Sequence, residues 1–138
     1  MAHLTASTYA DLINIVPVGS TRIIGNNTKA STYSESLAGS RNYVVDVRLH
    51  GHSIITLARG DWAEFSMCGY GTVTTRERLN HFLVPLGFRV SQNKGEQVLT
   101  RLSDGISVQI DPYGRYVVQT DGTASIRWGS PDALAIIA

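Results

Sequence analysis

Four short turn sequences divide the second half of the chain and constrain its fold more than any other feature. They are Asn93-Lys94-Gly95, Ser103-Asp104-Gly105, Asp111-Pro112-Tyr113-Gly114 and Thr120-Asp121-Gly122. Each ends in glycine, which accepts positive φ angles at little cost, and turns of this composition join antiparallel strands. The segments between them predict five strands at residues 88–92, 96–102, 106–110, 115–119 and 123–128. We therefore expect an antiparallel β meander.

One clear helix pattern precedes the predicted meander, at residues 75–84. The apolar side chains with the spacing of one helix face are Leu79, Phe82, Leu83 and Leu86. Thr74 and Glu77 have the spacing of a capping box at the start of the helix. Pro85 and Gly87 should end it, because proline disfavours helical geometry in the preceding residue and glycine accepts a left-handed cap.

The first half of the chain predicts short strands and a loop. Residues 43–50 alternate between apolar and polar side chains, and residues 53–57 and 62–67 flank a glycine-containing hairpin loop. The polar segment 28–42 is expected to be a long loop. Short helices are expected at both ends, from Thr8 and after Ser130-Pro131. The prediction is a single α+β domain over residues 1–138, with the central helix packed on a mainly antiparallel sheet.

Composition excludes several classes of protein. Hydrophobic residues are 43% of the 138 and charged residues 17%, below the ~25% of an average soluble protein, and the net charge is +1. This argues against a disordered chain and against binding to duplex nucleic acid, which requires neutralising many phosphates. Neither a signal peptide nor a membrane-spanning segment is expected. Cys68 is the only cysteine, so no internal disulfide forms.

The most informative segment for function is 69–78, in which a strand is expected to run through Gly-x-Gly into the capped helix. A helix start offers free backbone N–H groups and the positive end of a dipole, and both attract anions. Thr74, Thr75, Arg76 and Arg78 would add hydroxyls and positive charge there, and Tyr70 is a candidate for stacking on a base or sugar. A plain helix cap with solvated arginines, and an aromatic side chain used in packing, would produce the same sequence.

Three further residues complete the predicted ligand site. Arg48 and His50 share one face of the strand at residues 43–50, and Asn80 lies beside Arg76 on the polar face of the helix. His50 and His52 have a spacing that can bind zinc on a strand, but no further ligand lies at a recognisable spacing, so no metal or other cofactor is expected. No catalytic residue is expected either, because no carboxylate pair stands out and Cys68 has no base placed by the sequence.

Four segments resemble a widespread family of small bacteriophage-encoded proteins. They are 25–28, 47–51, 69–83 and 87–92, within a resemblance that extends over residues 25–99. Members of that family usually carry a Gly-Asn-Thr start, an Arg-Leu-His segment and a Gly-Trp-x-Thr-Val-Thr-Thr-x-x-Arg-x-Asn core. Tyr70 stands where the family usually has tryptophan, and segment 28–42 is longer than usual. The resemblance implies a phage origin and assigns no chemistry.

Three hypotheses for function follow. The first is a non-enzymatic accessory protein that binds a nucleotide or another small phosphorylated ligand in the host cytoplasm, sequestering a host signal. The second is a virion or assembly component, in agreement with the low charge and the abundance of serine, threonine and glycine. The third is a small enzyme. Self-association is expected because the apolar tail at residues 133–138 needs burial, either on its own domain or on a neighbouring copy.

Overall fold

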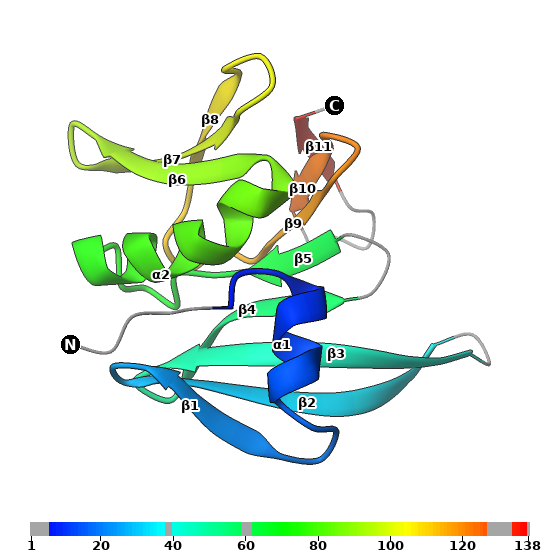
Figure 1. The fold of residues 1–138 in the computed structure, drawn as a ribbon. Coiled ribbons are helices and arrows are strands. Elements are labelled where there is room, and N and C mark those ends of the chain that lie inside the picture. Colours follow the sequence, from blue (N-terminus) through cyan, green and yellow to red (C-terminus); the bar gives the residue numbers. More distant parts are fainter. Residues whose placement is uncertain (1–5, 38–39, 59–61, 127–133, 138) are drawn as a thin grey trace.

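The computed structural model describes residues 6–37, 40–58, 62–126 and 134–137. Two α-helices and eleven strands make up these ranges (Figure 1). Their bounds are α1 Tyr9–Ile15, β1 Thr21–Gly25, β2 Thr28–Leu37, β3 Ser40–Leu49, β4 His52–Ala58, β5 Trp62–Phe65, α2 Val73–Leu83, β6 Phe88–Asn93, β7 Glu96–Arg101, β8 Ser107–Ile110, β9 Tyr116–Gln119, β10 Ala124–Ile126 and β11 Leu134–Ile137. The fold is α+β, as predicted. In these ranges, neither helix has the length and apolar character needed to span a membrane.

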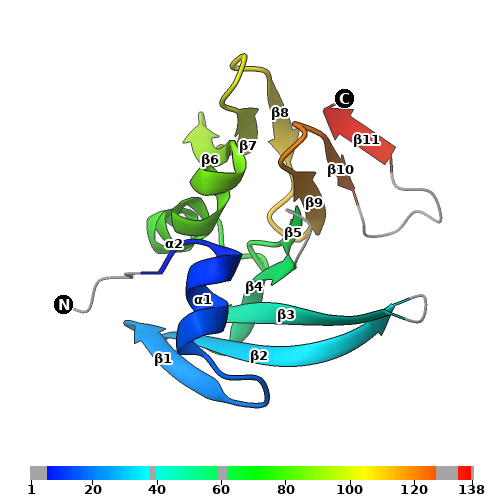
Figure 2. The same cartoon turned by 45° about the vertical axis from the view of Figure 1, so that its right-hand side comes forward.

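The strands form two sheets. The larger has eight strands in the order β1-β2-β3-β4-β5-β9-β10-β11, and each strand pair is antiparallel. The smaller contains β6, β7 and β8. In the turned view of Figure 2, β6–β8 stand apart from β10 and β11. The chain leaves the larger sheet after β5, forms α2 and the smaller sheet, and returns at β9.

The prediction of one continuous meander is therefore wrong at a single connection. The predicted strands after the helix are all present, but β8 and β9 lie in different sheets although only five residues separate them. β9 pairs with β5, placing Phe65 opposite Tyr116 and Ala63 opposite Val118. All four side chains are buried, so pairing with β5 buries apolar surface.

The prediction of a loop over residues 28–42 is wrong for residues 28–37 and 40–42, which belong to the paired strands β2 and β3. Residues 38–39 lie outside the described residues. On the core-facing side of β2, Thr28, Ala30 and Thr32 are buried opposite Leu49, Val47 and Val45. Small and hydroxylated residues fill these buried positions, so the usual apolar–polar alternation of a strand is hidden in the sequence.

Of the two short helices predicted near the chain ends, the first is present as α1. α1 begins at the predicted cap, because the side chain of Thr8 accepts a hydrogen bond from the Asp11 amide. At the other end, the predicted helix is wrong for the described residues Leu134–Ile137, which form β11 against β10. Backbone pairing to β10 outweighs local helix propensity in these four residues. The predicted cap at Ser130-Pro131 lies outside the described residues.

α2 is amphipathic and lies between the two sheets. Leu79, Phe82 and Leu83 are fully buried, and the helix contacts both β4 and β6 (Figure 1). It begins two residues earlier than predicted, with Thr72 rather than Thr74 as its N-cap. A short 3-10 turn, Val84–Leu86, follows it and ends at Gly87, whose φ of 90° is left-handed.

A single cluster of buried side chains joins these elements. Leu12 and Val16 from the α1 region, Phe65 from the larger sheet and Leu99 from the smaller sheet all belong to it. The fixed position of α2 within this cluster determines where its N-terminal end lies, and that end forms part of the candidate site.

Candidate functional site

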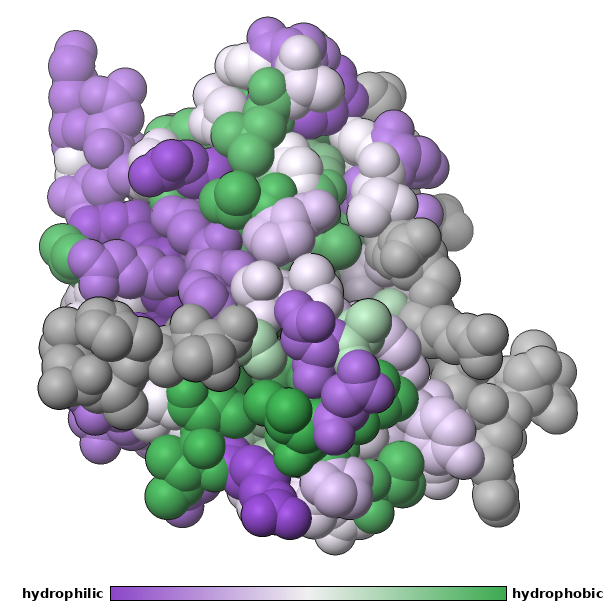
Figure 3. All heavy atoms as spheres, viewed as in Figure 1, coloured by the Kyte–Doolittle hydropathy of each residue, from purple (hydrophilic) through white to green (hydrophobic). Residues whose placement is uncertain are grey.

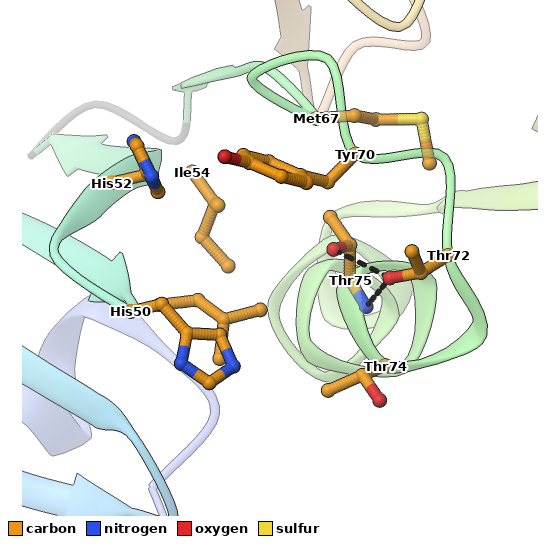
Figure 4. A pocket seen from close by; sticks show the side chains of 9 residues that line it. His50, His52, Ile54, Met67, Tyr70, Thr72, Thr74 and Thr75 are labelled. Atoms are coloured by element: carbon orange, nitrogen blue, oxygen red, sulfur yellow. Dashed lines mark hydrogen bonds between the residues drawn. The ribbon is translucent and has the colours of Figure 1, made fainter.

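A pocket of about 390 Å³ lies at the N-terminal end of α2. Its walls come from the β3–β4 turn, the start of β4 and the segment that leads from β5 into α2 (Figure 4). The lining residues are Leu49, His50, His52, Ile54, Met67, Tyr70, Thr72, Thr74 and Thr75. This volume lies within the usual range for small-molecule sites, roughly 300–1,000 Å³.

A tight turn brings the two histidines to the pocket. Leu49 pairs with His52, and the two residues between them have left-handed φ angles, 51° at His50 and 81° at Gly51. Two successive positive φ angles make the kind of turn whose twist matches that of antiparallel strands. Glycine adopts this conformation freely, and histidine is among the residues enriched in it. Both imidazoles are exposed at the pocket.

Tyr70 forms an aromatic wall. Its ring centroid lies 5.2 Å from that of His52, with the ring planes tilted by 44°. The Tyr70 amide donates to the Met67 carbonyl at 2.9 Å, which holds the connecting segment in a turn. The residue is 52% exposed, and its ring lies between His52 and Met67 in Figure 4. An exposed aromatic ring can stack on a planar group.

The floor of the pocket is apolar and its rim is polar. Leu49, Ile54 and Met67 are almost completely buried and line the floor. On the rim, Thr72 Oγ1 accepts from the Thr75 amide at 3.2 Å and lies 3.0 Å from Thr75 Oγ1. Such a lining can hold a molecule that has one apolar part and one polar part.

The first turn of α2 leaves donors free. The first amide with an acceptor inside the helix is that of Arg76, which bonds to the Thr72 carbonyl at 3.0 Å. The amides of Val73 and Thr74 have no acceptor among the described residues, and the Thr74 side chain is exposed. These amides lie at the positive end of the helix dipole.

The predicted arginines do not line the pocket. Arg76 instead donates to the Gly71 carbonyl at 3.0 Å and to the side-chain oxygens of Gln92 and Gln97 at 2.8 and 3.1 Å. It thereby fixes the start of α2 to β6 and β7. Arg78 donates to Thr28 Oγ1 at 3.1 Å and links α2 to β2.

Asn80 and Arg48 also have partners outside the pocket. Asn80 Nδ2 donates to the Val90 carbonyl at 2.8 Å, and its Oδ1 accepts from the Val90 amide at 2.7 Å. Arg48 Nε lies 2.8 Å from Asp46 Oδ2, and this hydrogen bond raises the pKa of Arg48 above its ordinary value. Arg48 points to the opposite face of β3 from Leu49, because strand side chains alternate.

The structure therefore brings half of the predicted site together. His50, Tyr70, Thr74 and Thr75 line one pocket, whereas Arg48, Arg76, Arg78 and Asn80 do not. The prediction left out Thr72 and the apolar floor, and it did not place His52 in the ligand site. The sequence contained one usable signal for His52, since Leu-His-Gly-His fits a strand, a two-residue turn and a second strand.

Among the lining residues, only His50 and His52 can carry a positive charge. Cys68 does not line this pocket, and its Sγ donates to the Ser53 carbonyl at 3.1 Å. Within the described ranges, no three His, Cys, Asp or Glu side chains come together as metal ligands would.

Comparison with known proteins gives one match. The family model for the Kyanoviridae Gp96 protein matches residues 19–127, which include every residue that lines the pocket. The chain belongs to this family. The expected phage origin is thereby confirmed at the level of a phage-encoded family. No curated protein and no solved structure matches the chain.

Proposed function

We propose that this Gp96-family protein binds a small phosphorylated ligand with a planar ring, such as a nucleotide, in the pocket at the start of α2. One observation carries the proposal: Tyr70, both histidines and Thr74, whose amide has no acceptor among the described residues, lie around one cavity of about 390 Å³. The protein acts as a binder and not as an enzyme. In an infected cell it would hold such a ligand away from a host system.

The parts of the pocket match the parts of a nucleotide. A base would stack on the Tyr70 ring above the apolar floor of Leu49, Ile54 and Met67. A phosphate would accept hydrogen bonds from the two amides at the helix start and from the Thr74 hydroxyl. The ring N–H groups of His50 and His52 would add hydrogen-bond donors at the pocket, whereas the three arginines have partners elsewhere.

A thermal-shift measurement tests this proposal. Nucleoside 5′-monophosphates are compared with the matching nucleosides and with inorganic phosphate. At a hundredfold excess over Kd, a nucleotide should stabilise the protein by about 2.7 kcal/mol. The nucleoside should stabilise less, because it lacks the group that the helix start would bind. A panel in which no nucleotide raises the melting temperature overturns the proposal.

Matched tyrosine variants locate the site. Tyr70→Ala should remove most of the nucleotide-induced shift, because it deletes the stacking wall. Tyr43→Ala removes another exposed tyrosine, 39% exposed on β3, that does not line the pocket and should leave the shift unchanged. Equal shifts for the wild type and Tyr70→Ala would assign the binding to another surface.

A virion or assembly component is the second candidate. The observation in its favour is an uncovered edge strand, β1, at the end of the larger sheet. Mass spectrometry of purified phage particles separates the two candidates, because an assembly component remains with the particle and a binder acting in the host cytoplasm does not.

A further inference from the structure

The strand β1 ends the larger sheet and pairs only with β2 among the described strands. Thr21, Arg22 and Ile23 are all exposed, and Ile23 is 76% exposed. Figure 3 shows hydrophobic residues gathered over the lower part of the molecule, where α1 and β1 lie in Figure 1. Ile15 and Val18, which precede β1 in the chain, are also about half exposed. An uncovered strand edge beside apolar side chains is a site for pairing with another strand.

The hydrogen-bond pattern shows which backbone groups of β1 point outward. The Thr32 amide donates to the Ser20 carbonyl at 3.3 Å, and the Thr32 carbonyl accepts from the Gly19 amide at 2.7 Å, so the backbone groups of Thr32 point toward the chain that leads into β1. Bonded and non-bonded pairs alternate along antiparallel strands. Arg22 and Ala30 are therefore the next bonded pair, whereas Thr21 and Ile23 face β2 as non-bonded pairs. The amides and carbonyls of Thr21 and Ile23 point away from the sheet.

We infer that β1 pairs with β1 of a second copy of this chain, antiparallel across a two-fold axis at Ile23. In this register Ile23 lies opposite the partner's Ile23, and Thr21 lies opposite the partner's Gly25. The outward amides and carbonyls then bond to each other, and two exposed isoleucines cover one another. The larger sheet continues without interruption from one copy into the other.

Charge decides the register. A two-fold axis at Arg22 also pairs the outward groups, but it sets Arg22 directly opposite the partner's Arg22. Like charges at directly opposite positions destabilise a strand pair. With the axis at Ile23, Arg22 lies opposite the partner's Ile24, and no charged side chain of β1 meets another. The strand is thus complementary to itself, which a closed two-fold interface requires.

The edge of the smaller sheet provides a contrast. β6 also ends a sheet, but the side chain of Asn80 bonds to both the amide and the carbonyl of Val90 on that strand. These groups are no longer open to a second chain. On β1, within the described part of the chain, no side chain covers the outward groups of Thr21 and Ile23 in this way.

Site-specific cross-linking tests the register. Directly opposite residues in a bonded antiparallel pair have Cα atoms about 5.5 Å apart, within the roughly 4.4–6.8 Å that a disulfide bridges. In a Cys68→Ser background, Ile23→Cys should form a covalent dimer under mild oxidation. Ile106→Cys, at a position 47% exposed beside the smaller sheet, is the matched control and should stay monomeric. Equal cross-linking of the two variants overturns the inference.

Sedimentation of the unmodified protein provides the second measurement. The wild type should sediment at twice its monomer mass of 15.0 kDa and dissociate on dilution. Ile23→Lys should be monomeric at the same concentrations. Its melting temperature should equal that of the wild type at dilutions where the wild type is monomeric, because the side chain is mostly exposed in one copy. A wild type that stays monomeric throughout, or a dimer that survives Ile23→Lys, overturns the inference.

Discussion

Asn80 connects α2 to the smaller sheet through the backbone of one residue. Its amide group satisfies both the N–H and the C=O of Val90, at 2.7 and 2.8 Å, as a neighbouring strand would do. Val90 is only 1% exposed, so water cannot replace these bonds easily. A residue that the sequence places among ligand-binding candidates is thus accounted for by a contact that holds the fold together.

Asn80→Ala should lower the free energy of unfolding by about 1–3 kcal/mol, because two buried backbone groups lose their partner. Urea denaturation measures the change. Glu77→Ala, at an exposed position on the same helix, is the control and should have an effect within about 0.5 kcal/mol. Equal effects of the two substitutions would contradict a bracing role for Asn80.

Asp104 makes the stability depend on pH. Its ion pair with Arg101 and its bond to the Ile106 amide lower the pKa of the Asp104 carboxyl below its ordinary value. The folded protein therefore binds this proton less readily than the unfolded chain, whose aspartates titrate near about 3.9. The stabilisation that these two Asp104 contacts give is fully present above the pKa of the unfolded chain, and it is lost as the pH falls through the lowered pKa of the folded protein.

Asp104→Asn should therefore be less stable than the wild type at pH 7, and the difference should shrink below about pH 4. Unfolding free energies measured in urea at neutral and acidic pH test this expectation. A difference that stays constant across the range would mean that Asp104 has the same pKa in the folded and unfolded chains.

At the scale of elements, the start of α2 determines both the helix and the pocket. Thr72 caps the helix and binds Thr75, whereas Thr74 has an exposed side chain in the first turn. The sequence predicts Thr74 as the cap, and the structure uses Thr72 instead. With Thr72 as the cap, Thr74 lies in the first turn and lines the pocket, and its amide has no acceptor among the described residues.

Thr72→Ala should cost about 0.5–2 kcal/mol, the usual range for losing an N-cap side chain. Thr74→Ala should cost much less, because its hydroxyl caps nothing. Thermal unfolding followed by circular dichroism compares the two variants. A larger loss of stability for Thr74→Ala than for Thr72→Ala would instead support the capping box predicted from Thr74 and Glu77.

At the scale of the whole molecule, the two sheets share one core. Leu99 of the smaller sheet and Val47 of the larger belong to the same buried cluster. Arg101 Nη1 also donates to the Gly122 carbonyl at 2.9 Å, which joins β7 to the turn between β9 and β10. Neither sheet can lose its packing without exposing apolar surface of the other.

Leu99→Ala should lower the unfolding free energy by about 2–5 kcal/mol, the usual cost of a buried cavity. Because the core is shared, the slowest-exchanging amides of the larger sheet should lose protection together with those of the smaller sheet. Hydrogen exchange measures both. Loss of protection confined to β6–β8 would show that the smaller sheet unfolds independently.

The candidate site was partly predictable. The sequence identified His50, Tyr70, Thr74 and Thr75, because strand and turn patterns place them next to the helix start. It could not show that Arg76 and Arg78 have partners within the fold. Those partners, such as Gln97 and Thr28, lie 21 and 50 residues away in the chain. Only the packed molecule brings such distant side chains together.

The sequence by itself determined the turns and the central helix. The Asn93-Lys94-Gly95 turn forms as predicted, with φ angles of 51° at Lys94 and 83° at Gly95, because local backbone preferences depend on adjacent residues. The tertiary structure alone decided which strands are partners. It separates β8 from β9, turns Leu134–Ile137 into a strand and pairs β2 with β3 over their whole length. Pairing depends on backbone hydrogen bonds and burial between distant segments, and no local pattern encodes those contacts.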